Sequence, residues 1–139
     1  MRPEYLLDAE PLVALLSPSD EHHAWALRHL PHLEAPFVTC EPVIVEAFHL
    51  LSKFPVGMDR LLEFCHSGAM EIDFRLLDSV DPLRELLRKY RDQPMDLADA
   101  CLVLLAEQHP QATLITTDRD FLVYRTRNRR QIRLLAPFQ

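Results

Sequence analysis

The sequence predicts an α/β fold in which a mostly parallel central sheet is flanked by helices, within a single domain that spans residues 1–139. Short β-rich segments alternate with helical segments along the chain, which is typical of βαβ units. The 139 residues suffice for one hydrophobic core, and no low-complexity segment, internal repeat or long linker divides them. Hydrophobic residues make up 48% of the chain and charged residues 26%, as in ordinary globular proteins.

The first half of the chain predicts two strands and three helices. Pro42 suits the first turn of a helix, and Ser19 or Asp20 can cap the helix before it. We expect strands over residues 4–8 and 37–39, and helices over 9–16, 25–30 and 42–51.

The second half predicts three more helices and three more strands. Asp81 and Pro82 open an amphipathic helix, because apolar residues follow at the i, i+3, i+4 and i+7 spacing of one buried stripe. We expect helices over 58–66, 81–90 and 96–108, and strands over 70–74, 113–116 and 131–135. Ligands of parallel sheets bind beyond the carboxyl ends of the strands, so functional residues are expected at that edge.

Glycine and cysteine usage excludes several classes of protein. The only two glycines, Gly57 and Gly68, are too far apart for a phosphate-binding loop or a dinucleotide fingerprint. Cys40, Cys65 and Cys101 are odd in number and lack zinc-ligand spacing, which argues against a disulfide framework and a zinc site. Small buried thiols in a reducing compartment are the simpler interpretation.

The chain shows no sign of export or membrane insertion. Glu4 and Asp8 interrupt the region where a signal peptide needs an apolar run, and the longest apolar run, residues 100–106, is too short to span a bilayer. We therefore expect a cytoplasmic protein without a membrane segment.

Acidic residues fall where the predicted sheet would gather them. Asp8 and Asp118 each stand at the carboxyl end of an expected strand, although either can simply cap the helical segment that comes next. Glu46 lies in a helix that is apolar nearly all round and that we therefore expect to be buried. The alternative to a ligand role for Glu46 is an ion pair with a buried arginine.

The pair Asp96 and Asp99 opens another helix that the sequence predicts to be buried. Capping explains Asp96, but it explains Asp99 less well because the helix around it offers no polar side. Four acids converging on one cleft repel one another unless a cation joins them, and clustered carboxylates favour Mg²⁺ or Mn²⁺.

Four motifs follow one another along the chain: YLLD at 5–8 with PLVALL at 11–16, PVIVEAF at 42–48, MDLADA at 95–100 and LITTDRDF at 114–121. In this order they resemble the motifs of the PIN-domain family, and within it those of the VapC-type ribonuclease toxins of bacterial toxin–antitoxin pairs. The resemblance implies four catalytic residues that are also the metal ligands: Asp8, Glu46, Asp99 and Asp118. It implies supporting roles for Asp96, Asp120, Glu10 and Thr116, although many relatives carry Ser or Thr where this chain has Glu10.

What the resemblance implies is a metal-dependent endoribonuclease that hydrolyses RNA phosphodiester bonds with Mg²⁺ or Mn²⁺. It also implies a small antitoxin protein as a partner and a homodimer. Apolar helices early in the chain, at residues 25–30 and 48–54, could supply these contacts, although core burial explains them equally well. The alternative is a PIN-like module that binds RNA or protein without cleaving it.

Arginines are concentrated near the end of the chain. Residues 119–133 contain six arginines and one acid, a balance of +5, so that the remaining residues carry −11 of the net charge of −6. In an extended segment Arg125, Arg127 and Arg129 would point the same way and, with Arg130, could bind an RNA backbone. The alternative is that these arginines pair with surface acids.

Overall fold

The computed structural model describes residues 3–139 and contains a five-stranded sheet in which every pairing is parallel. The strand order is β3-β2-β1-β4-β5, which puts β1 at the centre. The strands are β1 (Tyr5–Leu7), β2 (Phe37–Thr39), β3 (Met70–Ile72), β4 (Thr113–Ile115) and β5 (Leu134–Leu135). The predicted α/β class with a mostly parallel sheet is therefore confirmed.

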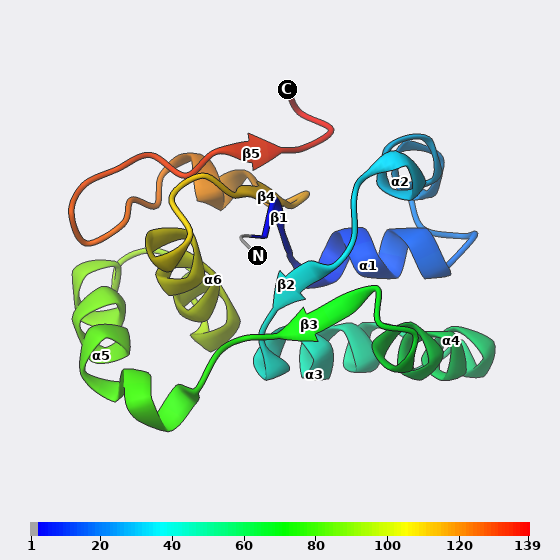
Figure 1. Ribbon diagram of the computed structural model, residues 1–139, viewed down its shortest axis with the longest axis horizontal. Coiled ribbons are helices and arrows are strands. Elements are labelled where there is room, and N and C mark those ends of the chain that lie inside the picture. The colour runs from blue at the N-terminus through cyan, green and yellow to red at the C-terminus, as the bar shows by residue number, and fades with distance from the viewer. Residues whose placement is uncertain (1–2) are drawn as a thin grey trace.

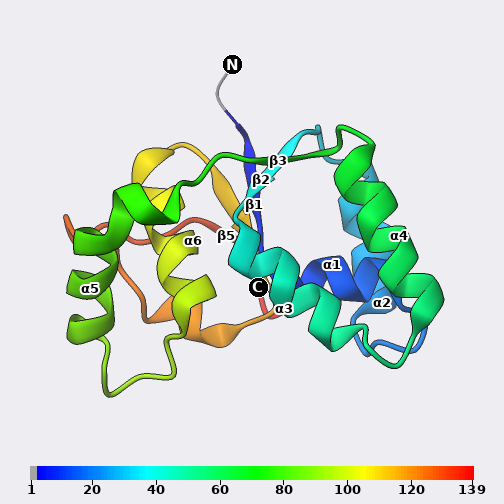
Figure 2. The same cartoon turned by 90° about the horizontal axis from the view of Figure 1, so that it is seen from below.

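Helices cover both faces of this sheet (Figures 1 and 2). One side carries α1 (Ala9–Leu16), α2 (His23–His29), α3 (Glu41–Leu50) and α4 (Pro55–His66), and the other carries α5 (Val80–Lys89) and α6 (Leu97–Gln108). Three short 3₁₀ turns complete the chain: η1 (Leu30–His32), η2 (Leu76–Ser79) and η3 (Arg119–Leu122). Nine of the twelve residues of α6 are buried, and so are Leu6 and Leu7 of the central strand. Asp8, which follows β1, and Asp99, in the first turn of α6, are buried as well.

Several element boundaries differ from the prediction. The strands expected over 70–74 and 131–135 are shorter, ending at Ile72 and beginning at Leu134. Neither Ser19 nor Asp20 caps α2; the Asp20 carboxylate instead accepts a hydrogen bond from the backbone N–H of His22.

The expectation that the third helix is buried nearly all round was wrong. Only Val43 and Ala47 of α3 are buried, whereas Val45 is 69% exposed and Leu50 is 48% exposed. The helix packs on α1 and α6 through one face and leaves an apolar face outside. A run of apolar residues alone does not distinguish these two situations.

Two of the cysteines match the expectation of small buried thiols. Cys40 and Cys101 are fully buried, whereas Cys65 is only half-buried. Within residues 3–139 no helix has both the length and the apolar character that a bilayer span requires.

Candidate active site

The carboxyl ends of β1 and β4 bring two of the predicted acids together. The two strands pair directly, and the backbone N–H of Asp8 continues the ladder by donating to the carbonyl of Ile115 at 3.0 Å. Beyond the ladder, the Thr116 hydroxyl donates to Oδ2 of Asp8 at 2.8 Å and accepts from the N–H of Asp118 at 3.0 Å. Thr116 therefore sits between the two acids and fixes their relative position.

Both acids also cap the segments that follow them, as the simpler interpretation predicted. Oδ1 of Asp8 accepts from the N–H of Ala9 at 2.7 Å, and Oδ1 of Asp118 accepts from the N–H of Asp120 at 2.9 Å. Each cap uses one carboxylate oxygen. Capping and a role at the site are therefore compatible.

Glu10 adds a further carboxylate to this edge from the first turn of α1. It is exposed, and it accepts a 2.5 Å hydrogen bond from the hydroxyl of Thr117 in the loop after β4. This contact ties α1 to the segment that carries Asp118. The supporting acid predicted at position 10 lies beside the two strand-end acids, as its effect on their pKa values also indicates.

The first turn of α6 supplies Asp96 and Asp99, which cap each other. The N–H of Asp99 donates to Oδ1 of Asp96 at 2.8 Å, and the N–H of Asp96 donates to Oδ2 of Asp99 at 3.2 Å. This reciprocal capping box includes Asp99, for which capping seemed the weaker explanation. Asp99 is nevertheless only 8% exposed, and its Oδ1 is not used by the capping box.

Glu46 reaches the same region from the margin of the packed face of α3, where it is half-buried. Burial raises its pKa, and the charges of Asp96, Glu10 and Asp118 raise it further. Within residues 3–139 no arginine, lysine or histidine forms an ion pair with it. The alternative of a buried arginine partner is therefore not observed.

We refer to Asp8, Glu46, Asp96, Asp99 and Asp118 as the acidic cluster. Burial raises the pKa of Asp8 to about 7, against the hydrogen bonds from Thr116 and Ala9 that lower it. Burial likewise raises the pKa of Asp99 to about 8, with further contributions from the neighbouring carboxylates. The pKa of Asp118 is raised mainly by burial as well. The cluster therefore concentrates negative charge in a poorly hydrated place.

This donor set fits a hard divalent cation in its chemistry and charge. Carboxylate oxygens are the ligands that Mg²⁺ and Mn²⁺ prefer, and a dication would offset the mutual repulsion of the acidic cluster. In the part of the chain that the structure describes, however, no three acidic, histidine or cysteine side chains already surround one point.

A groove of about 740 Å³ opens beside the acidic cluster, between α3, the first turn of α6 and the segment after β3. Glu46 and Asp96 lie on its wall, and most of the remaining lining is apolar, including Val45, Phe74 and Leu97. No pattern in the sequence indicated this groove. Val45 of α3 and Leu97 of α6 are exposed, and the apolar composition of these two helices did not indicate which of their residues face solvent.

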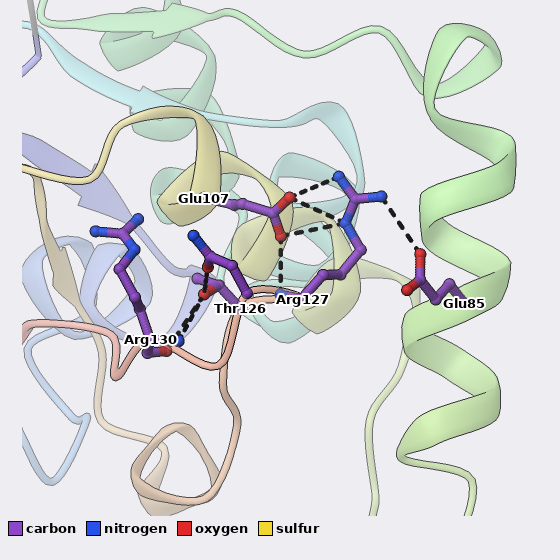
Figure 3. A network of polar contacts seen from close by, with 6 residues as sticks. Glu85, Glu107, Thr126, Arg127 and Arg130 are labelled. Atoms are coloured by element: carbon purple, nitrogen blue, oxygen red, sulfur yellow. Dashed lines mark hydrogen bonds and ion pairs between the residues drawn. The ribbon is translucent and has the colours of Figure 1, made fainter.

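The arginine segment does not have the extended geometry that we expected. Arg125 pairs with Gln131 across a hairpin, and Arg129 occupies the left-handed region with φ of 67°. The guanidinium of Arg127 lies between two glutamates, 2.6 Å from Glu107 and 3.3 Å from Glu85 (Figure 3). The prediction that Arg125, Arg127 and Arg129 point the same way in an extended segment was therefore wrong.

The ion pairs of Arg127 also place it away from the acidic cluster. Glu107 lies in the last turn of α6, about 12 Å along the helix axis from Asp99 at a rise of 1.5 Å per residue. Burial raises the pKa of Glu107, but the hydrogen bonds and charge of Arg127 outweigh this effect, so the pKa falls below its ordinary value. The alternative of surface ion pairing thus describes Arg127 correctly.

Arg119 is the arginine that follows Asp118 directly, and no sequence pattern distinguished it from the other arginines. It is exposed, it comes immediately after Asp118, and its guanidinium lies over the ring of Phe138 at 5.0 Å from the centroid. The contact between Arg119 and Phe138 could not be predicted from the sequence around either residue. Arg119 is nearer to the acidic cluster in the chain than any of the four arginines that we predicted to bind RNA.

Comparison with known proteins agrees with this architecture. The PIN domain family model matches residues 5–126. The chain is 26% identical over 117 residues to Ribonuclease VapC26 of Mycobacterium tuberculosis, a match that covers 82% of this chain and 86% of that protein. The crystal structure of Mycobacterium tuberculosis VapC20, a sarcin-ricin loop cleaving toxin, superposes with a TM-score of 0.74 at 16% identity, covering 84% of this chain and 91% of the other. The chain belongs to the PIN domain family.

Proposed function

We propose that this protein is a metal-dependent endoribonuclease that hydrolyses RNA phosphodiester bonds. The observation that carries the proposal is the convergence of carboxylates from four separate segments at the carboxyl edge of the sheet, without a basic partner within residues 3–139. Similarity to a protein named as a ribonuclease supports the same chemistry. A binding surface for RNA alone gives no reason to gather acids that repel the RNA backbone.

The residues that would hold Mg²⁺ or Mn²⁺ are Asp8, Glu46, Asp99 and Asp118. A divalent cation, when bound, supplies a water of lowered pKa and offsets the charge that builds up on the scissile phosphate. Thr116 keeps Asp8 and Asp118 at a fixed separation through its two hydrogen bonds. Asp96 orients Asp99 through the capping box, and Glu10 and Asp120 supply further negative charge beside them.

The partners that we propose are RNA, a small antitoxin and a second copy of the chain. Apolar side chains exposed on α2 and α3 fit a protein interface. Leu27 of α2 is 49% exposed, and in α3 Leu50 is 48% and Phe48 36% exposed. Ala26 and Leu30, which the sequence analysis grouped with them, belong to the core. Light scattering at tens of micromolar tests the dimer, and a monomer there contradicts it.

The decisive experiment compares cleavage and binding on one RNA sample. Purified protein is incubated with structured and single-stranded RNA in Mg²⁺, in Mn²⁺ and in EDTA, with the Asp99→Asn protein as the control. Cleavage that needs the metal and disappears in the variant supports the proposal. RNA binding without cleavage under all conditions supports the alternative of a non-catalytic module. Sequencing of RNA ends after induction in cells then identifies the substrate.

A further inference from the structure

The groove beside the acidic cluster has a wall of apolar side chains that the fold leaves exposed. It opens between α3, the first turn of α6 and the segment after β3, and it has a volume of about 740 Å³. Val45 and Leu97 line it, and both are exposed to solvent. Concave apolar surface of this kind is typical of sites that bind organic groups, which commonly measure about 300–1,000 Å³. The groove is therefore large enough for a nucleobase with its ribose.

The position of the groove links it to the proposed metal site. Glu46 and Asp96 belong to the acidic cluster and also line the groove. A phosphate bound through a cation at the acidic cluster would therefore have one of its two neighbouring nucleotides beside the groove. The apolar wall and the acids thus form one continuous surface for an RNA strand.

The charged side chains of the groove favour the base of that nucleotide over its phosphate. They include three acids, Glu41, Glu46 and Asp96, and no lysine or arginine of residues 3–139 lines the groove. Arg75 lies between two lining residues in the sequence, but its guanidinium donates to Asp78 at 2.8 Å. Phosphates are bound by lysine and arginine and are repelled by acids. The uncharged base is therefore the part of a nucleotide that suits this groove.

The acids of the groove also distinguish between bases. Glu41, at the start of α3, is exposed and is not part of the acidic cluster, so its carboxylate is available to a ligand. Ionised carboxylates only accept hydrogen bonds. The amino group of cytosine donates one, whereas uracil, like thymine, presents a carbonyl oxygen at that position. Among the residues of 3–139 that line the groove, His49 alone has a side chain that can donate.

We propose that the groove receives an unpaired nucleobase of the RNA substrate, next to the scissile phosphate, whose amino group donates to Glu41. The base would pack on the apolar wall that Val45 and Leu97 provide. This inference rests on the proposed function, because a phosphate at the acidic cluster brings the base to the groove. It implies a single-stranded or looped RNA as the substrate, since a base paired within a helix cannot enter.

Val56 provides a matched control for Val45. Both valines are exposed positions of helices, but Val56, in the first turn of α4, does not line the groove. Replacing either with Trp adds the same bulk, and only Val45→Trp fills the groove. Glu71 of β3 is the corresponding control for Glu41, because it is exposed and lies outside the groove lining.

The first test measures kcat/KM in Mg²⁺ on a short single-stranded RNA whose cleavage site has been mapped. Two copies of this RNA carry an abasic ribose on one side or the other of the cleaved bond. We expect one of them to lower kcat/KM of the wild type about 10-fold, as for loss of a stacked base. Val45→Trp should lose as much on the intact RNA and nothing further on that copy. Val56→Trp should match the wild type throughout.

The second test exchanges the base at the position that the abasic RNA identifies. The wild type should cleave the RNA with cytosine there about 5-fold faster than the RNA with uracil. Glu41→Gln should remove most of this preference, because an amide can donate as well as accept, and Glu71→Gln should keep it. Calorimetry should give Val45→Trp the Mn²⁺ affinity of the wild type, which separates the groove from the metal ligands.

Several outcomes overturn the inference and leave the proposed function intact. One is an abasic RNA that slows the wild type and Val45→Trp by the same factor, and another is equal cleavage at cytosine and uracil. Weaker Mn²⁺ binding by Val45→Trp assigns its loss to the acidic cluster instead. If Val45→Trp cleaves like the wild type but has a different oligomeric state in light scattering, the groove holds a second copy of the chain. Absence of cleavage by the wild type overturns the inference together with the proposed function.

Discussion

Thr116 and Asp8 are 108 positions apart in the sequence, yet the hydroxyl of Thr116 donates a 2.8 Å hydrogen bond to Oδ2 of Asp8. Both side chains are buried, so the bond forms where water cannot replace it. The contact exists because β1 and β4 are adjacent parallel strands whose carboxyl ends coincide. It joins the two strand-end acids of the acidic cluster into one unit.

Replacing Thr116 with Val should therefore damage both stability and activity. The substitution keeps the β-branched shape but leaves a buried carboxyl oxygen without its donor, which costs about 1–3 kcal/mol. It should also raise the pKa of Asp8 further, because the Thr116 hydrogen bond lowers that pKa in the wild type. Urea denaturation and RNA cleavage measure the two effects. Thr116→Ser retains the hydroxyl and should restore most of both; equal loss in the two variants would contradict the role of this bond.

The sequence was sufficient to predict the sheet class, most elements and the placement of strand-end acids. Asp8 and Asp118 follow β-rich runs, and parallel strands bring such positions to one edge whatever the details of packing. What it could not predict was the outcome of contacts between distant segments. The exposure of Val45 depends on which face of α3 packs on α1 and α6, and the apolar composition of the helix does not specify that face.

The prediction for the arginine segment was wrong for the same reason. Arg127 is held by Glu85 and Glu107, which lie 42 and 20 positions away, and no local pattern identifies them. The lack of a hydrogen-bond partner for the Tyr124 hydroxyl within residues 3–139 likewise became apparent only in the tertiary structure. The type of a residue predicts which ligands its side chain can bind. Whether that side chain is free to bind them depends on neighbours that only the tertiary structure brings close.

Asp99 and Asp96 should respond differently to the same change. Asn keeps the oxygen that accepts the capping hydrogen bond, so Asp99→Asn and Asp96→Asn should both fold with little loss of stability. Cleavage should fall by at least about 100-fold in Asp99→Asn, because loss of a metal ligand costs more than loss of a group that orients one. Asp96→Asn should keep most of the activity. Equal loss of cleavage in the two variants would show that their roles are not divided in this way.

The stability of the metal-free protein should depend on pH through the two most buried acids. Burial raises the pKa of Asp8 from 3.8 to about 7 and that of Asp99 to about 8. The folded state therefore holds these protons more tightly than the unfolded state, and the free energy of unfolding falls as the pH rises from about 4 to about 8. Melting curves in EDTA between pH 5 and 8.5 should show this decline. Asp8→Asn should flatten the slope; an unchanged slope would contradict the assignment to Asp8.

Glu46 offers a direct measure of the repulsion within the acidic cluster. Its pKa is raised by burial and by neighbouring carboxylates, so Glu46→Gln should relieve repulsion in EDTA at pH 8 and raise the melting temperature by about 3 °C. Saturating Mg²⁺ should stabilise the wild type more than the variant, because the variant lacks one of the carboxylate ligands of the ion. Glu41 lies on the same helix and is exposed, so Glu41→Gln serves as the control for a general charge effect. If Glu46→Gln melts below the wild type in EDTA, Glu46 has a structural partner.

The dependence of RNA binding on salt should distinguish Arg119 from Arg127. Arg119 is exposed next to Asp118 and is held over Phe138 without an ion pair in the described chain, so its charge is available to a phosphate near the acidic cluster. Arg119→Gln should weaken binding of all RNA sequences and reduce the slope of log affinity against log salt by about 0.7, the value for one phosphate contact on a single strand. Arg127→Gln should leave that slope unchanged and lower the free energy of unfolding by about 1 kcal/mol, because it removes the guanidinium that pairs with Glu107 and Glu85. A reduced slope in Arg127→Gln with unchanged stability would instead place the RNA path over the hairpin.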